Sequence, residues 1–256
     1  MAEDPDPREV PDRTGGQVQL IYLLPNLLTL AAICAGLTAI RLGFEGDYEL
    51  AVYLVLAACV LDGLDGRLAR LMKRPSAVGA ELDSLADFLN FGVAPVLILH
   101  NWGLQDLPRV GWIAVLVYAI CCVLRLARFN VSSREAKDAA ASDFFVGVPS
   151  PAGAVLVLFP MVLSFALSEL PLAPAPVVAL HICVIGLLMI SRIPTYSFKR
   201  MKIDRRRARY YLLGAVALAA ALLTFLWVTL AVLSVVYVLM LVLAHRGARR
   251  NQNREE

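Results

Sequence analysis

Long apolar runs follow one another through most of this chain, and they constrain the fold more than any other feature. A helix needs about 20 apolar residues to cross a hydrocarbon layer about 30 Å thick. The runs cover roughly residues 22–40, 50–72, 83–100, 111–128, 151–168, 176–193 and 210–244. Because 59% of the 256 residues are apolar and only 18% are charged, a large soluble domain has no room. We predict an all-α, polytopic integral membrane bundle.

The run at 210–244 would make a helix about 50 Å long, which is too long for one crossing. We expect two crossings that turn near Trp227, and hence about eight transmembrane helices, although no Gly, Pro or charge marks that turn. The membrane domain then covers residues 18–245. An acidic tail at 1–17 precedes it, is expected to be disordered and lacks the pattern of a signal peptide; a basic tail at 246–256 follows it.

The basic residues of the loops predict how the bundle is oriented. If both termini lie on one side, the loops and the C-terminal tail on that side carry 17 lysines and arginines. The opposite side has two, Arg41 and Arg109. Since lysine and arginine collect in cytoplasmic loops, we expect both termini in the cytoplasm and the protein in the cell's inner membrane.

Two further features argue against other classes of protein. The basic loop at 192–209 lies between two crossings without interleaved aromatic residues, so it fits a topology signal and attraction to anionic lipids, and we expect no nucleic-acid partner. The five cysteines all lie within apolar runs, with no C-x-x-C spacing, so disulfides or a zinc site are not expected.

Four aspartates interrupt two neighbouring apolar runs. Asp62 and Asp65 are three residues apart and Asp83 and Asp87 four apart, so each pair shares one face of its helix. Counted from Pro75 in the turn between the runs, Asp65 and Asp83 are 10 and 8 residues away, and Asp62 and Asp87 are 13 and 12 away. The two pairs therefore match in depth and are expected to converge in a cavity open to the cytoplasm. Intramembrane carboxylates mark a functional site by default.

Such a cluster favours a metal site. Carboxylates this close repel one another unless protons or cations lie between them. With oxygen ligands and neither His nor Cys nearby, two divalent cations, Mg²⁺ or Mn²⁺, fit best and would leave room for a phosphate.

Small residues and one arginine surround the aspartates. Gly66, Ala69 and Gly79 remove bulk along the hairpin, and Arg70 follows Gly66 by four residues on the same face, where it can hold a phosphate. The alternative is that the small residues only allow helices to pack closely.

Together these residues have the pattern D-x2-D-G-x2-A-R-x8-G-x3-D-x3-D over positions 62–87. The pattern resembles the signature of the CDP-alcohol phosphotransferase family at every fixed position. The resemblance implies a membrane enzyme, commonly a homodimer, that transfers a phosphoryl-linked group from a CDP-linked donor to an alcohol and releases CMP.

The resemblance also implies roles for individual residues. Asp62, Asp65 and Asp83 would bind metal, and Asp87 would both bind metal and act as the catalytic base. The CDP donor would be bound by Gly66, Ala69, Arg70, Ser76 and Gly79, and by Pro25, Asn26 and Thr29 near the start of the first run. Pro25 and Asn26 are also typical of an ordinary helix start at the membrane interface.

Outside the signature, four stretches resemble bacterial phosphatidylserine synthases of that family. They are DFLNFGVAP (87–95), RLARFN (125–130), FFVGVPSPAG (144–153) and SRIPTYSFK (191–199). The resemblance implies CDP-diacylglycerol as donor, L-serine as acceptor, phosphatidylserine as product and membrane lipid as partner.

The chemistry of serine supports this reading, because its carboxylate needs a cation near the catalytic base. Arg125, Arg128 and Asn130 lie at the cytoplasmic end of the fourth run and Ser150 at the start of the fifth, so they are candidate acceptor ligands. The arginines are equally typical of cytoplasmic anchors. Two alternatives stay open: another acceptor, such as glycerol 3-phosphate, an inositol phosphate or choline, or a cation transporter whose aspartates bind the transported ion.

Overall fold

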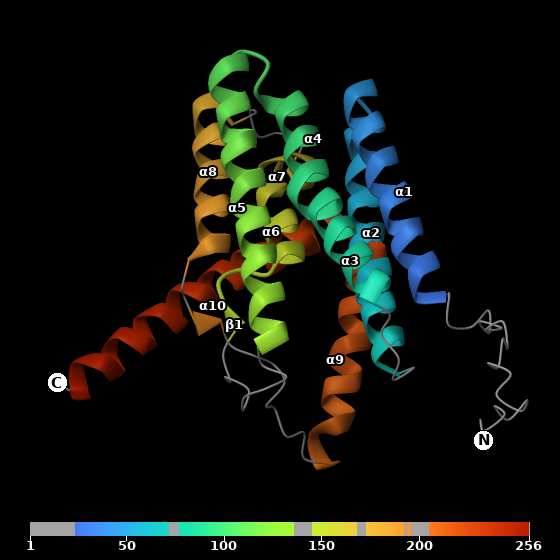
Figure 1. The fold of residues 1–256 in the computed structure, drawn as a ribbon. Helices are drawn as coiled ribbons and strands as arrows, with labels where there is room; N and C mark the ends of the chain where they lie inside the picture. Colours follow the sequence, from blue (N-terminus) through green and yellow to red (C-terminus); the bar gives the residue numbers. More distant parts are fainter. Residues whose placement is uncertain are drawn as a thin grey trace, which may run out of the picture.

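A computed structural model of the chain describes residues 24–71, 77–135, 145–167, 173–191, 194–195 and 205–255, and the predicted tail at 1–17 lies outside them. The described part is helical apart from two short strands (Figure 1). In chain order the elements are α1 (Leu24–Glu45), α2 (Tyr48–Leu71), α3 (Ala77–Asp87), η2 (Phe88–Val93), α4 (Ala94–Gly103), α5 (Pro108–Glu135), β1 (Phe145–Val146), α6 (Ser150–Val157), α7 (Phe159–Ala166), α8 (Ala175–Ile190), β2 (Pro194–Thr195), α9 (Arg205–Thr224) and α10 (Leu226–Glu255).

Where the structure describes the predicted apolar runs, they are mainly helical, which agrees with an all-α bundle whose long apolar helices fit a membrane. Four stretches of the described chain are long and apolar enough to cross a membrane, namely Leu24–Glu45, Val78–Gly103, Pro108–Ser132 and Leu226–Ala244. Two shorter apolar helices cover Ala175–Ile190 and Arg209–Thr224. Length and apolarity alone thus support four crossings, half of the expected number.

Helix α1 packs closely on its neighbours because its buried face is built from small residues. Ala32, Gly36, Ala39 and Gly43 recur every three or four positions along that face. A Cβ atom on Gly36 would lie 2.0 Å from the Asn90 side-chain oxygen, so a larger residue there would force the Asn90 side chain to move. The close fit places α1 beside both α2 and the segment that follows Asp87 (Figure 1).

Helices α3 and α4 form one apolar stretch with a π-helical segment, η2, between them. Pro95 lies at the start of α4 and has no N–H, so the carbonyl of Phe91, four residues earlier, lacks its helical donor. The hydroxyl of Tyr118 on α5 donates to that carbonyl at 3.0 Å. The wide turn after Asp87 is therefore held by a side chain from a neighbouring helix.

A second proline lies where the apolar run that starts near residue 151 divides into α6 and α7. Pro160 leaves the carbonyl of Leu156 without its helical donor. The Nε2 atom of His181 on α8 lies 2.9 Å from this oxygen, and since a carbonyl only accepts, Nε2 carries the proton. His181 thus has a structural partner within the bundle.

The two short strands join segments that are distant in sequence. Phe145 pairs with Thr195 and Val146 with Pro194, antiparallel. Gly147 follows with φ of 85°, and a Cβ atom there would lie 2.6 Å from the Met189 carbonyl oxygen. This close approach holds the residues before α6 against the end of α8.

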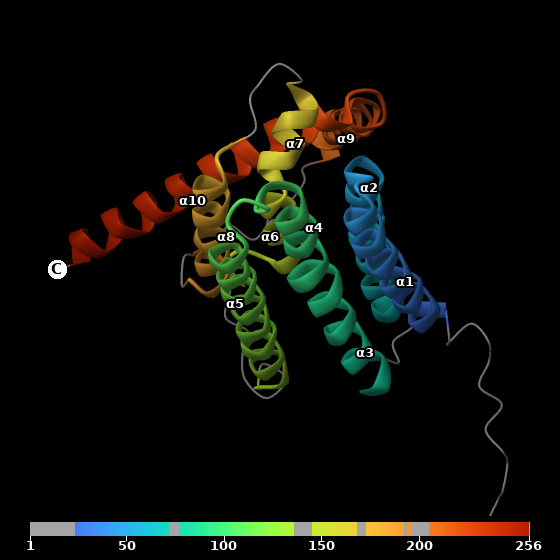
Figure 2. The ribbon, with the colours of Figure 1, turned by 90° about the horizontal axis from the view of Figure 1, so that it is seen from above.

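The last two helices separate where a turn was expected. Helix α9 ends at Thr224 and α10 begins at Leu226, close to the predicted position near Trp227. Seen from above, α10 runs obliquely past α7 and α8 and away from the bundle (Figure 2). Its buried residues, Leu230, Ala231, Ser234, Leu241 and Ala244, form one inward stripe.

Candidate active site

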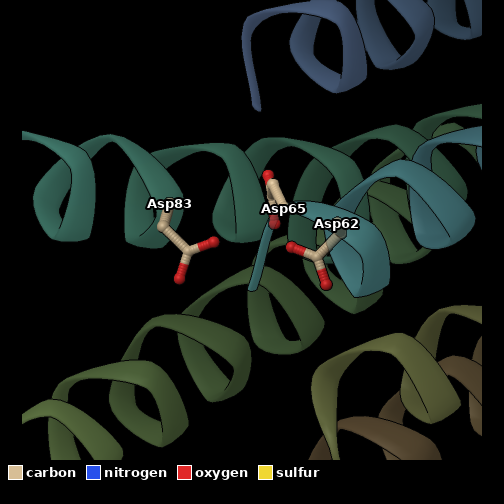
Figure 3. A group of neighbouring side chains, drawn as sticks. All are labelled: Asp62, Asp65 and Asp83. Carbon is tan, nitrogen blue, oxygen red and sulfur yellow. The ribbon is translucent and has the colours of Figure 1, made fainter. Parts of the chain in front are cut away.

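Three of the four predicted aspartates gather at one point between α2 and α3. One carboxylate oxygen each from Asp62, Asp65 and Asp83 lies within 4.8 Å of the others. In Figure 3 the Asp62 and Asp83 carboxylates point into the space between the two helices, with Asp65 between them in this view. Asp65 is 3% exposed, whereas Asp62 and Asp83 are half-buried. The cluster is therefore anchored in the protein and open on one side.

The fourth aspartate, Asp87, lies beside this cluster at the end of α3. Its carboxyl group is within hydrogen-bonding range of Asp62, as the matched depth of the two residues predicts. Its other oxygen, Oδ1, is buried and has no hydrogen-bond partner among the described residues. Asp87 thus joins the metal-ligand candidates to the part of the site that faces α5.

The start of α1 reaches the cluster through Thr29. Its hydroxyl lies 2.7 Å from Oδ2 of Asp65 and 3.1 Å from the carbonyl of Pro25. Both Thr29 and Pro25 are buried, and Asn26 is half-buried one residue later. The structure therefore brings the predicted first-helix residues next to the aspartates, with Thr29 in contact with Asp65.

Gly66 and Arg70 of the hairpin border open space. A Cβ atom on Gly66 would meet nothing within 4 Å, so close helix packing does not explain why this residue is a glycine. Close packing is still an explanation for other small residues of the bundle. Arg70 is exposed, and its Nε donates to the carbonyl of Gly66 at 2.8 Å. Ala69 and Gly79 lie on α2 and α3 as expected, and Ser76 lies outside the described residues.

The chemistry of this donor set fits divalent cations. All candidate ligand atoms are carboxylate oxygens, which Mg²⁺ and Mn²⁺ prefer. The buried Oδ1 atoms of Asp65 and Asp87 both lack a hydrogen-bond partner in the described part of the chain. Buried oxygens with no partner carry a large desolvation cost, which a bound cation would offset.

Two of the four candidate acceptor ligands lie together near Asp87. Arg125 donates from Nε to the carbonyl of Val148 and from a terminal nitrogen to the hydroxyl of Ser150 at 2.6 Å. Its guanidinium group also interacts electrostatically with Asp87. A cation beside the candidate base is the arrangement that an acceptor with a carboxylate requires.

The other two candidates bond to different helices. Arg128 donates to the carbonyl of Ile190 at 2.8 Å, and the Asn130 amide donates to the hydroxyl of Ser84 at 3.0 Å. Arg128 therefore holds the end of α8, and Asn130 holds α3. Their role as acceptor ligands stays a prediction.

Asn90 is a polar residue near the site, and no sequence pattern assigned it a role. It lies three residues after Asp87, is 1% exposed, and neither amide atom has a hydrogen-bond partner among the described residues. The only signal in the sequence is one amide within an apolar stretch of DFLNFGVAP. Its burial comes from the close approach of Gly36, which no local pattern predicts.

Comparison with known proteins agrees with this geometry. Residues 22–193 match the CDP-alcohol phosphatidyltransferase family. A protein of Mycobacterium tuberculosis (strain ATCC 25618 / H37Rv) named CDP-diacylglycerol–serine O-phosphatidyltransferase is 41% identical over 202 residues, which are 78% of this chain and 70% of that protein. Proteins of the same name from Helicobacter pylori (strain ATCC 700392 / 26695) and Bacillus subtilis (strain 168) are 37% and 34% identical; these matches cover 71% and 69% of this chain, and 75% and 92% of the relatives.

The match contains the whole carboxylate hairpin, the first helix and the segment from α5 to α8. It therefore covers each group of side chains that the structure brings together around Asp62 and Asp87. The chain belongs to the CDP-alcohol phosphatidyltransferase family.

Proposed function

We propose that this protein transfers the phosphatidyl group of CDP-diacylglycerol to the hydroxyl of L-serine, giving phosphatidylserine and CMP. The observation that carries the proposal is the convergence of Asp62, Asp65 and Asp83, with oxygens within 4.8 Å, beside the open space at Gly66. The relatives named for serine transfer, which are up to 41% identical, support serine as the acceptor.

Asp62, Asp65, Asp83 and Asp87 would hold two divalent cations, Mg²⁺ or Mn²⁺. When bound, these ions would neutralise the pyrophosphate of the donor and stabilise the charge on the departing CMP. Hydrogen bonding from Thr29 fixes one oxygen of Asp65 and leaves the other available as a ligand.

The donor would lie along the open side of the hairpin. Gly66 borders open space, and with Ala69 and Gly79 it would line the nucleotide; Arg70, which is exposed, can turn from the Gly66 carbonyl to a phosphate. Pro25, Asn26 and Thr29 would border the same space from α1, and Ser76, which lies between α2 and α3 in the sequence, stays a predicted contact of the donor.

Asp87 would act as the base. It takes the proton of the serine hydroxyl while the serine oxygen forms a bond to the phosphorus that bears diacylglycerol, and the bond from that phosphorus to CMP breaks. The support is that Asp87 interacts with Asp62 and Asp83 of the carboxylate cluster and with Arg125, and has a buried oxygen with no partner among the described residues.

Arg125 and Ser150 would bind the acceptor. The guanidinium group can hold the serine carboxylate, and its bonds to Ser150 and Val148 fix its direction. Arg128 and Asn130 would support the same region through α8 and α3.

The acceptor assay tests the proposal. Purified full-length protein in lipid vesicles is supplied with CDP-diacylglycerol, Mg²⁺ or Mn²⁺ and one alcohol at a time: L-serine, glycerol 3-phosphate, an inositol phosphate or choline. We expect CMP release that depends on serine, with little release from the other alcohols or from donor alone. Faster release with another alcohol, or cation flux across the vesicles without any nucleotide, would contradict the proposal.

The setting of the reaction is part of the proposal. The protein would cross the inner membrane about eight times, with both termini and the active site on the cytoplasmic side, and would act as a homodimer. The support is the 17 to 2 distribution of basic residues for the orientation and the family resemblance for the dimer.

A further inference from the structure

One buried polar group near Arg125 comes from a helix that lies outside the family match. Tyr237 lies on α10, seven residues before Ala244 and three after Ser234, on the inward stripe of that helix. The matched residues end at 193, so the family signature assigns no role to any α10 residue.

The hydroxyl of Tyr237 is buried and has no hydrogen-bond partner among the described residues. Leaving a hydroxyl in this state costs about 1–3 kcal/mol, whereas a phenylalanine would fill the same space without that cost. The ring by itself therefore explains the packing of α10 but does not explain the oxygen atom.

The charged group with which the Tyr237 hydroxyl interacts electrostatically is the guanidinium of Arg125. The same guanidinium bonds to Ser150 and interacts with Asp87. Arg125 thus connects the Tyr237 hydroxyl to the candidate base and to the loop before α6.

We propose that Tyr237 binds the acceptor, by donating a hydrogen bond from its hydroxyl to the carboxylate of L-serine that Arg125 holds. A carboxylate accepts several hydrogen bonds, and an uncharged donor beside the guanidinium adds direction without adding charge. This inference rests on the proposed function, because it names a residue of the acceptor site. It also gives α10 a part in the reaction.

Tyr237→Phe tests the inference, since it removes only the oxygen atom. CMP release is measured on full-length protein in vesicles, once against serine at saturating CDP-diacylglycerol and once against CDP-diacylglycerol at saturating serine. We expect the KM for serine to rise about tenfold, as the loss of one hydrogen bond to a charged group implies. The KM for CDP-diacylglycerol and kcat are expected to change less than twofold.

Tyr210→Phe is the matched control, because it removes the same atom from an exposed side chain on α9. Its KM for serine should equal that of the unmodified protein. An unchanged KM for serine in Tyr237→Phe would overturn the inference, and a raised KM for CDP-diacylglycerol alone would place the hydroxyl on the donor instead.

Two other outcomes are also decisive. If Tyr237→Phe fails to fold, the hydroxyl has a structural role and the inference is wrong. If the unmodified protein releases no CMP in response to serine, the proposed function is wrong. That result comes from the unmodified protein alone, so it is distinct from a failure of the inference on Tyr237, which only the comparison of variants reveals.

Discussion

Thr29 is the residue whose contact in the structure most directly affects the metal site. A hydroxyl has one proton, and beside an ionised carboxylate it points that proton at the charged oxygen. The 2.7 Å contact with Asp65 therefore orients this carboxylate, while the longer contact of 3.1 Å with the Pro25 carbonyl is secondary.

Thr29→Val should weaken the response to metal. Valine keeps the shape and removes the hydrogen bond to a charged oxygen, which is worth about 1.5 kcal/mol, so the Mg²⁺ concentration for half-maximal activity should rise about tenfold. A metal titration of CMP release measures this. Thr38→Val is the control on the same helix, because Thr38 donates only to the Cys34 carbonyl and is exposed. Equal titration curves for both variants would remove Thr29 from the metal site.

Asp87→Asn should abolish turnover while leaving donor and metal binding partly intact. Asparagine keeps the size of the side chain but cannot take the serine proton, so the rate should fall at least about 100-fold. Single-turnover CMP release and binding of labelled CDP-diacylglycerol measure the two effects. Asp106→Asn, at an exposed position in the turn before α5, should change neither. A near-native rate in Asp87→Asn would exclude this residue as the base.

Asp62→Ala or Asp83→Ala should lose metal-dependent activity altogether, because each removes one of the three oxygens that lie within 4.8 Å of one another. The unmodified protein should likewise stop releasing CMP when a chelator is added and recover with Mg²⁺ or Mn²⁺. Full activity in the presence of the chelator would contradict the two-cation site.

Individual helices near the site are shaped by prolines and by side chains from their neighbours. Pro95 and Pro160 each leave one carbonyl without a helical donor, and Tyr118 and His181 fill the two positions. The sequence shows the prolines and predicts interruptions. It does not show which distant side chain supplies the missing hydrogen bond, because that depends on how α5 and α8 pack.

Tyr118→Phe should destabilise the segment after Asp87. It leaves the buried carbonyl of Phe91 without a partner, at a cost of about 1–3 kcal/mol. Thermal unfolding in detergent should show a lower midpoint, with Tyr211→Phe on exposed α9 as the matched control. An unchanged midpoint would mean that the π-helical segment needs no support from α5.

At the scale of the whole molecule, the distribution of charge predicts how the bundle sits in the membrane. Single cysteines introduced into a cysteine-free variant test this with a reagent that does not cross the membrane. Asp106→Cys, in the turn before α5, should be labelled from outside the inner membrane, and Asn253→Cys, near the end of α10, only after the membrane is opened. The reverse pattern would place the carboxylate cluster on the outer side and contradict the proposed orientation.

The sequence determined the features that depend on local spacing. The lengths of the apolar runs predicted the helices, and the intervals between Asp62, Asp65, Asp83 and Asp87 predicted two acidic helix faces at equal depth, because the pitch of a helix is fixed. The break near Trp227 followed from length alone.

Only the tertiary structure decided which groups from separate helices meet. It placed Thr29 on Asp65, Arg125 on Ser150, and the Tyr237 hydroxyl near Arg125, pairs that are 36, 25 and 112 residues apart. It also gave Arg128 a hydrogen bond to the end of α8 and Asn130 one to α3, partners that the sequence does not reveal. Spacing along one helix fixes the face on which a side chain lies. Which helix packs against that face depends on the packing of side chains, on close approach at small residues and on the need to pair buried polar atoms.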